Sequence, residues 1–519
     1  MSIVPQKENK NIEFKEKLTP SIHLKDIKKQ HLASQMKYLL EIGNGTAVYV
    51  IGVDDDGKSK GLSELDFEET MSVLKVIAIE NNARIEKVEK FSDNGGLVGK
   101  LIIVKASENG IKNHLVVASA GHVNAGKSTI IGTLMTGKPD TSGKHWLYLD
   151  TLPHEIERNL SADLHYALFG FKHGKPIHLK NPLDKKERAR VAEGSDKLIS
   201  FIDTVGHEPW VKTTIRGLVG QNIDYGLLVV ATDDGVTHIT KEHLGLLIAM
   251  NIPVIVCLTK IDRASKRKIE ETETQIDELL KNIGRIPYNI KDENDLNVTI
   301  DKLDTIVPIL KTSSVTLEGY DLLKKFLLDL PERRKNFSKP LIMFIDKIYN
   351  VSGVGTVVSG TIKQGKLQAG KELMLGPDEE GKFRRVKATS IETHYHRVTE
   401  ADTGFVVGIA LRGVNYDDLE RGMILCETAP KVVKSFEADI LVLTHPTRIT
   451  DGYEPVIHVA TVAESARVEL TGKDYLKAGE TGNVKFTFKY SPHYMEEGDR
   501  FIFREGKTKG IGTVTKVLS

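Results

Sequence analysis

The stretch GHVNAGKST, residues 121–129, limits what this chain can fold into more than any other feature of its sequence. It matches the pattern G-x-x-x-x-G-K-S/T, with an apolar run, HLVVAS, before it and a run of helical character, STIIGTLM, at its end. Glycines let backbone N–H groups approach phosphate oxygens, and the first turn of the following helix adds a positive end. Strand, loop and helix in this order predict a P-loop nucleotide-binding domain, with a glycine-rich structural turn as the alternative.

We expect the whole loop to contact the nucleotide. The candidate binding residues are therefore Gly121, His122, Val123, Asn124, Ala125, Gly126, Lys127, Ser128 and Thr129. Lys127 can reach the β- and γ-phosphates as a point charge, and the hydroxyl of Ser128 can bind Mg²⁺.

A second motif, DTVGH, begins at Asp203, where the apolar run LISFID ends. An aspartate at this place can hold a water molecule on Mg²⁺, and Gly206 can offer its N–H to the γ-phosphate. We therefore add Asp203 and Gly206 to the nucleotide site, and Asp203 joins Ser128 as a candidate metal ligand. The alternative is an ordinary aspartate that ends a strand before a glycine turn.

The motif TKID follows the apolar run PVIVCL and contributes Thr259, Lys260 and Asp262. A carboxylate only accepts hydrogen bonds, and guanine presents N1–H and an exocyclic amine side by side. Adenine lacks this pair of donors, so Asp262 favours guanine and disfavours a P-loop ATPase or kinase. The aliphatic part of the Lys260 side chain can pack on the face of the base.

Ser313 and Ser314, after the run TIVPIL, are expected to close over the base, unless they form only a serine-rich turn.

The remaining sequence predicts a multidomain chain of α/β and β units. Apolar strands alternate with helix-length stretches over residues 113–335, which predicts a P-loop GTPase domain with a mainly parallel sheet. After the charged stretch PERRKNFSKP, short β-branched runs with glycine turns predict two β-barrels, over 336–432 and 433–519. Residues 1–112 predict a small α/β domain, with helices near 31–40 and 67–80, a strand that runs into an Asp-Gly turn over 46–58, and a second strand near 97–106.

Composition limits the partners and the cellular compartment that we expect for the protein. The 72 basic and 71 acidic residues give a net charge of +1, so nucleic-acid binding would depend on local patches. No apolar run reaches the ~20 residues of a membrane span, and the first residues do not resemble a signal peptide. Cys257 and Cys426 each lie in an apolar run and are expected to be buried thiols. We expect a cytoplasmic monomer without membrane contact.

With these motifs in order, the sequence resembles the translational GTPases related to elongation factor Tu and elongation factor 1-alpha. The likeness is carried by GHVNAGKST, DTVGHEPWVKTTIRGL and TKID, by GVGTVVSGTIKQGKLQAGKELMLGP in the first barrel, and by FIFREGKTKGIGTV in the second. It extends from near residue 113 to the end of the chain. Within that group the chain resembles the GTP-binding protein 1 and 2 subfamily, as an archaeal-type member.

The resemblance implies a GTPase that alternates between GTP and GDP, uses Mg²⁺ and is stimulated by the ribosome. Its GTP form is expected to hold aminoacyl-tRNA, or another RNA, across the P-loop domain and the first barrel, and to deliver or monitor it on the ribosome. The resemblance also implies that His207 orients the attacking water as the catalytic residue. It implies that Ser161 is the Mg²⁺ ligand of the first switch loop, where an ordinary serine helix cap is the alternative.

The sequence is also compatible with a second function. The separate block of residues 1–112 would suit a GTP-regulated adaptor that recruits RNA-processing or quality-control factors. The basic stretch LKNPLDKKERARVAEG is expected to be a solvated charged loop, with an RNA-contacting switch loop as the alternative.

The sequence departs from the family pattern at three positions. Val205 stands where proline is common, and Asn124 stands where an aspartate linked to a monovalent cation is usual. Thr259 stands where asparagine is usual. A single hydroxyl cannot make all the contacts of an amide, so we expect Thr259 to weaken nucleotide binding.

Overall fold

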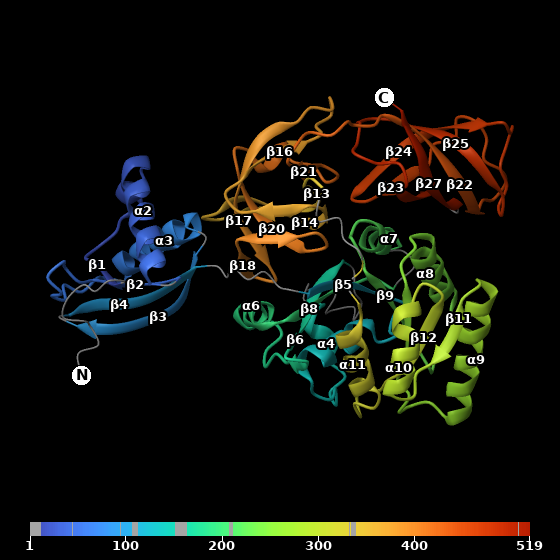
Figure 1. Ribbon diagram of the computed structural model, residues 1–519, viewed down its shortest axis with the longest axis horizontal. Helices are drawn as coiled ribbons and strands as arrows, with labels where there is room; N and C mark the ends of the chain where they lie inside the picture. The colour runs from blue at the N-terminus through green and yellow to red at the C-terminus, as the bar shows by residue number, and fades with distance from the viewer. Residues whose placement is uncertain are drawn as a thin grey trace.

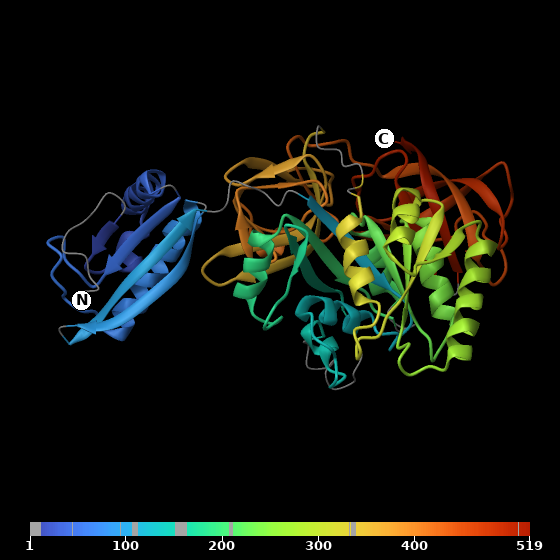
Figure 2. The same ribbon diagram turned by 60° about the horizontal axis from the view of Figure 1, so that its bottom comes forward.

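The computed structural model of the chain describes residues 12–43, 45–81, 83–93, 95–105, 113–150, 163–206, 211–331, 333, 339–506 and 508–518. Figure 1 shows a small N-terminal unit at one end, a large helix-covered sheet below, and two β units above it. The turned view in Figure 2 keeps the N-terminal unit apart from the packed body formed by the other three.

The N-terminal unit is a four-stranded sheet with helices packed on one face. Its elements are β1 (Ile12–Lys15), α1 (Pro20–His23), α2 (Asp26–Ile42), β2 (Thr46–Ile51), α3 (Glu64–Glu80), β3 (Ala83–Asp93) and β4 (Gly96–Lys105). The strand order is β1-β2-β4-β3, with β1 parallel to β2 and the other pairs antiparallel. Met36 and Leu74 of the helices pack with Tyr49 and Leu101 of the strands in one buried cluster.

The predicted helices and the two predicted strands of this unit are confirmed, and β1 and β3 are additional. The apolar residues Ile85, Val88 and Phe91 of β3 are spaced by three, so the sequence lacks the two-residue alternation that indicates a strand. A register shift between Ile85 and Lys87 explains the first of these spacings, because an extra residue in a strand breaks its two-residue alternation; from Val88 to Phe91 the register is regular, so these two side chains point to opposite faces.

The second unit is the predicted α/β domain. Its elements are β5 (Asn113–Ala120), α4 (Lys127–Thr136), η1 (His145–Tyr148), β6 (His165–Lys172), β7 (Lys175–Ile177), α6 (Lys185–Gly194), β8 (Lys197–Asp203), α7 (Val211–Val219), β9 (Tyr225–Ala231), α8 (His238–Ala249), β10 (Val254–Thr259), α9 (Lys266–Asn282), β11 (Ile286–Asn289), α10 (Glu293–Thr299), η3 (Ile300–Lys302), β12 (Ile306–Lys311) and α11 (Tyr320–Asp329).

The sheet order of this unit is β11-β12-β10-β9-β5-β8-β6-β7. Neighbouring strands run parallel from β11 to β8, whereas β6 and β7 are antiparallel. The apolar runs are continuous because side chains are buried on both faces, in two core clusters. The carboxyl ends of β5, β8, β9, β10 and β12 therefore meet along one edge, where ligands bind in such sheets.

The two β units are closed six-stranded barrels, as the glycine-punctuated sequence predicts. The first contains β13 (Ile342–Val351), β14 (Gly355–Gln364), β15 (Lys366–Gln368), β16 (Glu372–Gly376), β17 (Arg384–Thr393), β18 (His396–Val398), β19 (Glu400–Asp402), β20 (Val406–Arg412), η4 (Tyr416–Asp418) and β21 (Ile424–Cys426). The order β16-β21-β13-β14-β20-β17 closes through the pairing of β16 with β17.

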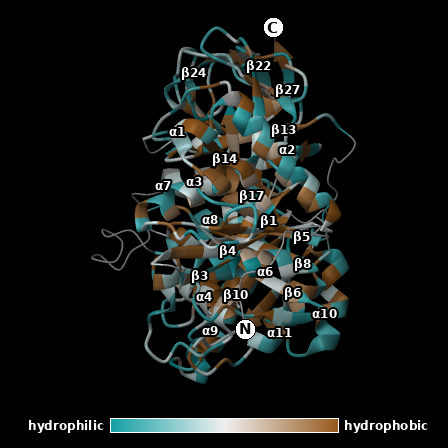
Figure 3. Cartoon of the chain, turned by 90° about the vertical axis from the view of Figure 1, so that its left-hand side faces the viewer, coloured by the Kyte–Doolittle hydropathy of each residue, from teal (hydrophilic) through white to brown (hydrophobic). Residues whose placement is uncertain are grey.

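The second barrel contains β22 (Ser435–Thr444), β23 (Val456–Val459), β24 (Val462–Thr471), β25 (Thr481–Phe488), β26 (Arg500–Glu505) and β27 (Thr508–Leu518). It closes in the order β22-β25-β24-β23-β26-β27, around the packed rings of Phe436, Phe486 and Phe501. Figure 3 shows hydrophobic segments through the middle of the units and hydrophilic segments on the outer loops and helices. The domain boundaries at residues 112, 335 and 432 stay predictions.

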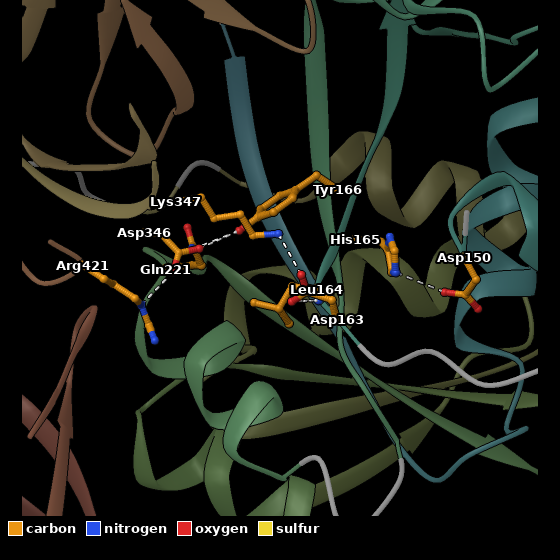
Figure 4. A network of polar contacts seen from close by, with 9 residues as sticks. All are labelled: Asp150, Asp163, Leu164, His165, Tyr166, Gln221, Asp346, Lys347 and Arg421. Carbon is orange, nitrogen blue, oxygen red and sulfur yellow. Dashed lines mark hydrogen bonds and ion pairs between the residues drawn. The ribbon is translucent and has the colours of Figure 1, made fainter. Parts of the chain in front are cut away.

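Polar contacts tie the units together. Arg397 of the first barrel is buried and donates to the Ala83 carbonyl of the N-terminal unit at 2.9 Å. The buried Asp346 carboxylate of the same barrel accepts hydrogen bonds from Tyr166 and Gln221 of the second unit (Figure 4). These contacts fix the first barrel between the N-terminal and second units.

Two expectations about the chain as a whole can be compared with the structure. Cys257 and Cys426 are buried free thiols, and burial raises the pKa of each to about 12, so this prediction is confirmed. Within the described ranges no helix is both long and apolar enough to cross a membrane.

Candidate nucleotide-binding site

A cavity of about 470 Å³ opens at the carboxyl ends of the parallel strands, and its volume suits a small ligand. Three sequence motifs that lie far apart along the chain meet there. The lining residues are Val123, Asn124, Gly126, Lys127, Ser128, Thr129, Asp140, Gly143, Trp146, Asp150, Gly206, Thr259, Lys260, Asp262, Arg263, Ser314 and Val315.

The phosphate loop needs glycine at Gly126 because the backbone is left-handed there, with φ at 95°, directly before α4 begins. The Lys127 ammonium folds back over the loop, where it donates to the carbonyls of Gly121 at 3.2 Å and His122 at 2.9 Å. Burial lowers the pKa of Lys127. A side chain at Gly206 would collide with this ammonium, so that glycine allows the second motif to approach the loop closely.

The two predicted metal ligands lie side by side. The Ser128 hydroxyl donates to one carboxylate oxygen of Asp203 at 2.6 Å, and Ser119 donates to the other at 2.5 Å. Asp203 is almost fully buried. A hydroxyl and a carboxylate together form the kind of oxygen donor pair that Mg²⁺ prefers, so these residues fit that ion.

The TKID motif contributes to both the loop and the cavity wall. The buried Thr259 hydroxyl donates to the carbonyl of Ala125 at 2.6 Å and so holds the phosphate loop. Lys260 has a left-handed backbone, with φ at 60°, and its ammonium pairs with Asp233 at 3.1 Å. Asp262 is exposed to the cavity, where a carboxylate can accept from a base edge.

The two serines after β12 have different environments. Ser313 is fully buried, and its hydroxyl accepts the N–H groups of Val315 and Thr316 at 3.2 and 3.1 Å. It therefore shapes the turn and does not line the cavity. Ser314 does line it, and its hydroxyl lies 2.7 Å from the Tyr320 hydroxyl.

Not every predicted residue reaches the cavity. Gly121, His122, Ala125 and Asp203 lie behind its wall, where their contacts support the lining residues. His207 and Ser161 lie outside the described residues. The expected contacts of all these groups with a nucleotide stay predictions.

Sequence reasoning missed one wall of the cavity, formed by residues 140–150, which follow α4 and include η1. Asp140 is buried, its carboxylate accepts the Lys144 N–H at 2.9 Å, and its own N–H donates to the Ser314 carbonyl at 2.8 Å. Asp150 faces the cavity and pairs with His165 at 3.5 Å (Figure 4). The turn signals in KPDTSG and the rare tryptophan, Trp146, were the available clues.

The basic stretch of residues 179–194 is only in part the solvated loop that its composition predicts. Lys185, Lys186 and Arg190 are exposed, but Lys185–Gly194 form α6, whose first turn is capped by the Asp184 carboxylate. Arg188 is largely enclosed, because it donates to the carbonyls of Pro182, Tyr166 and Tyr148 at 2.7, 3.2 and 3.3 Å. Burial lowers the pKa of Arg188. The prediction was wrong for Arg188 because its partners include two tyrosines that are remote in the sequence.

Comparison with known proteins decides which P-loop family this is. Residues 112–419 match the family described as "Elongation factor Tu GTP binding domain", and residues 429–518 match "Elongation factor Tu C-terminal domain". The chain belongs to the elongation factor Tu family of GTP-binding proteins. It is 35% identical to GTP-binding protein 1 of Xenopus laevis over 94% of this chain and 76% of that protein.

A second relative agrees with this assignment, and a solved structure shares the fold. The chain is 34% identical to human GTP-binding protein 2, over 99% of this chain and 88% of that protein. Elongation factor SelB of Methanococcus maripaludis, solved in complex with the GTP analogue GppNHp, shares the fold with a TM-score of 0.56 at 23% identity. That alignment covers 79% of this chain and 80% of SelB. The chain is therefore a GTPase related to translation factors, and the ATPase or kinase alternative is set aside.

The contact of Thr259 with the loop generates a first prediction. Thr259→Val removes the hydroxyl but keeps the shape, so the Ala125 carbonyl loses its donor and the loop is less firmly held. We expect GTP and GDP to bind about tenfold more weakly, which corresponds to roughly 1.4 kcal/mol. Titration with a fluorescent guanine nucleotide measures this. Thr259→Ser retains the hydroxyl and should bind like the natural protein. Equal affinity in the valine variant would contradict the role of the hydroxyl.

Proposed function

We propose that the chain binds GTP with Mg²⁺ in this cavity, hydrolyses it when the ribosome stimulates it, and delivers or monitors aminoacyl-tRNA there. The observation that carries the proposal is the convergence of the phosphate loop, the Ser128–Asp203 pair and the TKID loop on one cavity, in a chain of the elongation factor Tu family. The cavity volume suits a nucleoside triphosphate, and Lys127 supplies a positive charge at the end of the phosphate loop.

The phosphate end of the nucleotide is assigned to the loop and Lys127. In this proposal the loop amides bind phosphate oxygens, Lys127 neutralises charge on the β- and γ-phosphates, and the Gly206 N–H binds the γ-phosphate. Ser128 and Asp203 hold Mg²⁺, Asp203 through a water molecule, and Ser161 completes this set from the first switch loop. Bound Mg²⁺ would neutralise charge that develops on the phosphates.

The base end is assigned to the TKID loop. Asp262 accepts the two adjacent donors of guanine, while Lys260 and Ser314 border the base. Lys260 is already oriented by Asp233, which limits the side-chain freedom that binding would otherwise remove. Thr259 also lines the cavity, but its hydroxyl is bonded to the Ala125 carbonyl, so we assign it to holding the loop.

Nucleotide selectivity follows from Asp262. Asp262→Asn replaces an acceptor by a donor toward guanine, so GTP should bind at least about 100-fold more weakly. Xanthine carries an oxygen where guanine carries the amine, so the variant should gain affinity for XTP. Competition between GTP, ATP and XTP for a labelled guanine nucleotide measures both effects. Asp234→Asn, at an exposed site in the turn after β9, is the matched control. Similar affinities of the natural chain for GTP and ATP would refute the base assignment.

Hydrolysis is assigned to His207 as the residue that orients the attacking water. His207→Ala should raise the activation barrier of ribosome-stimulated hydrolysis by about 3–5 kcal/mol, while GTP affinity stays unchanged. Phosphate release with and without ribosomes measures the first quantity, and nucleotide titration measures the second. Unchanged stimulation in the variant would remove His207 from the mechanism.

RNA binding is assigned to a second cavity, between the GTPase domain and the first barrel. It encloses about 320 Å³ and is lined by Tyr148, Leu149, Leu164, His165, Tyr166, Leu183, Lys185, Arg188 and Tyr395. The Lys185 ammonium lies 5.2 Å from the centre of the Tyr395 ring. Aromatic rings beside cations suit the bases and phosphates of an unpaired RNA end, such as the end of a tRNA that carries the amino acid.

Filter binding of aminoacyl-tRNA tests this part of the proposal. Binding should be strong with a non-hydrolysable GTP analogue and weak with GDP. Tyr395→Ala should weaken it about tenfold or more, because a base–aromatic stack contributes about 1–3 kcal/mol. Tyr416→Ala, at an exposed site elsewhere on the same barrel, is the control. Equal binding in both nucleotide states would exclude tRNA delivery and favour the adaptor function of residues 1–112.

A further inference from the structure

His243 lies in the middle of the domain and belongs to none of the nucleotide motifs. It sits in the second turn of α8, within the stretch KEHLGLLIAM, and its side chain is 1% exposed. Its Nδ1 atom accepts the backbone N–H of Gly121, the first residue of the phosphate loop, at 2.8 Å. A side chain 122 residues away along the chain thus holds the start of the loop.

The bond requires a neutral imidazole with its proton on Nε2, because Nδ1 is the acceptor. The surroundings keep His243 in that form. Burial, with the nearby charges of Lys127, His122 and Lys509 acting in the same direction, lowers the pKa of His243 to about 3. The imidazole therefore stays uncharged at neutral pH.

The peptide on the other side of Gly121 is also fixed. Its carbonyl accepts from Lys127 at 3.2 Å, and a side chain at this position would strike the Val229 carbonyl of β9. His243 is the side-chain acceptor on the N–H side, Lys127 the donor on the carbonyl side. Without His243 the Gly121 N–H would be buried without an acceptor, which costs about 1–3 kcal/mol and favours a rotated peptide.

The helix that carries His243 is itself held at two points by the second barrel. Glu242, the residue before His243, forms an ion pair with Lys509 of β27. At the carboxyl end of the helix, Arg500 of β26 donates to the Ala249 carbonyl at 2.6 Å. A helix anchored at two points holds His243 at a fixed distance from the loop.

We propose that His243 is a positioning residue for the phosphate loop: by accepting the Gly121 N–H it fixes the loop in its nucleotide-binding shape and slows nucleotide release. The inference rests on the proposed GTP site and names a residue that controls how long the nucleotide stays there. His243 does not touch the reacting atoms, so it acts on the nucleotide only through the loop.

The test compares two substitutions of His243 in the full chain. In His243→Asn, the amide oxygen can occupy the place of Nδ1 and accept the same N–H. His243→Leu keeps a similar volume without an acceptor. We expect His243→Leu to release a fluorescent GDP about tenfold or more faster than the natural chain, and His243→Asn to differ by less than about threefold. His238→Asn, at an exposed site in the same helix, is the control. Single-turnover hydrolysis of bound GTP should be alike in the natural chain and in the His238→Asn control.

A second measurement does not depend on nucleotide binding. Hydrogen exchange at the Gly121 amide, followed in the nucleotide-free proteins, should be slow in the natural chain and in His243→Asn, and faster in His243→Leu. Equal GDP release from the leucine and asparagine variants, or equal exchange at Gly121, would overturn the inference. If the natural chain binds no guanine nucleotide, the proposed function fails, and the exchange experiment still decides whether His243 holds the loop.

Discussion

The phosphate loop keeps its shape because buried hydrogen bonds from neighbouring elements hold it. His243 of α8 accepts the N–H of Gly121, Thr259 at the end of β10 donates to the Ala125 carbonyl, and Asp203 at the end of β8 accepts from Ser128. A glycine-rich loop loses much conformational freedom on folding, so it needs such contacts to hold one conformation. The parallel sheet supplies them by bringing the strand ends to one edge.

Buried polar contacts also hold the first barrel against the GTPase domain. Asp346 of the first barrel is a buried carboxylate, which is costly unless its oxygens are paired. It is paired with Arg421 of its own barrel at 3.1 Å, and with Tyr166 and Gln221 of the GTPase domain (Figure 4). Tyr166 also lines the cavity assigned to RNA. A shift of the barrel against the GTPase domain would leave Asp346 with Arg421 but remove Tyr166 and Gln221 from a buried charge, so the interface favours discrete arrangements over gradual sliding.

Much of this architecture could be predicted from the sequence because its signals are local. The strand–loop–helix order around Lys127 and the alternation of apolar runs indicate the sheet, and repeated glycine turns indicate the barrels. The spacing of the motifs placed Asp262 and Ser128 at one site. Contacts between residues far apart in the sequence were out of reach. Nothing in KEHLGLLIAM shows that His243 faces Gly121, and nothing in a run of lysines and arginines shows that Arg188 is enclosed.

The three departures from the family pattern are each compatible with a contact or conformation at that position. Thr259 is a short side chain whose hydroxyl reaches the loop directly. Asn124 has φ at 58°, a left-handed conformation that asparagine adopts more readily than most residues. Val205 is buried, and its carbonyl accepts from Thr214 at 2.5 Å, so packing and a hydrogen bond fix the turn that proline would otherwise stiffen. A motif can therefore change its residues and keep its geometry, provided the surrounding elements supply the constraint that the usual residue carries.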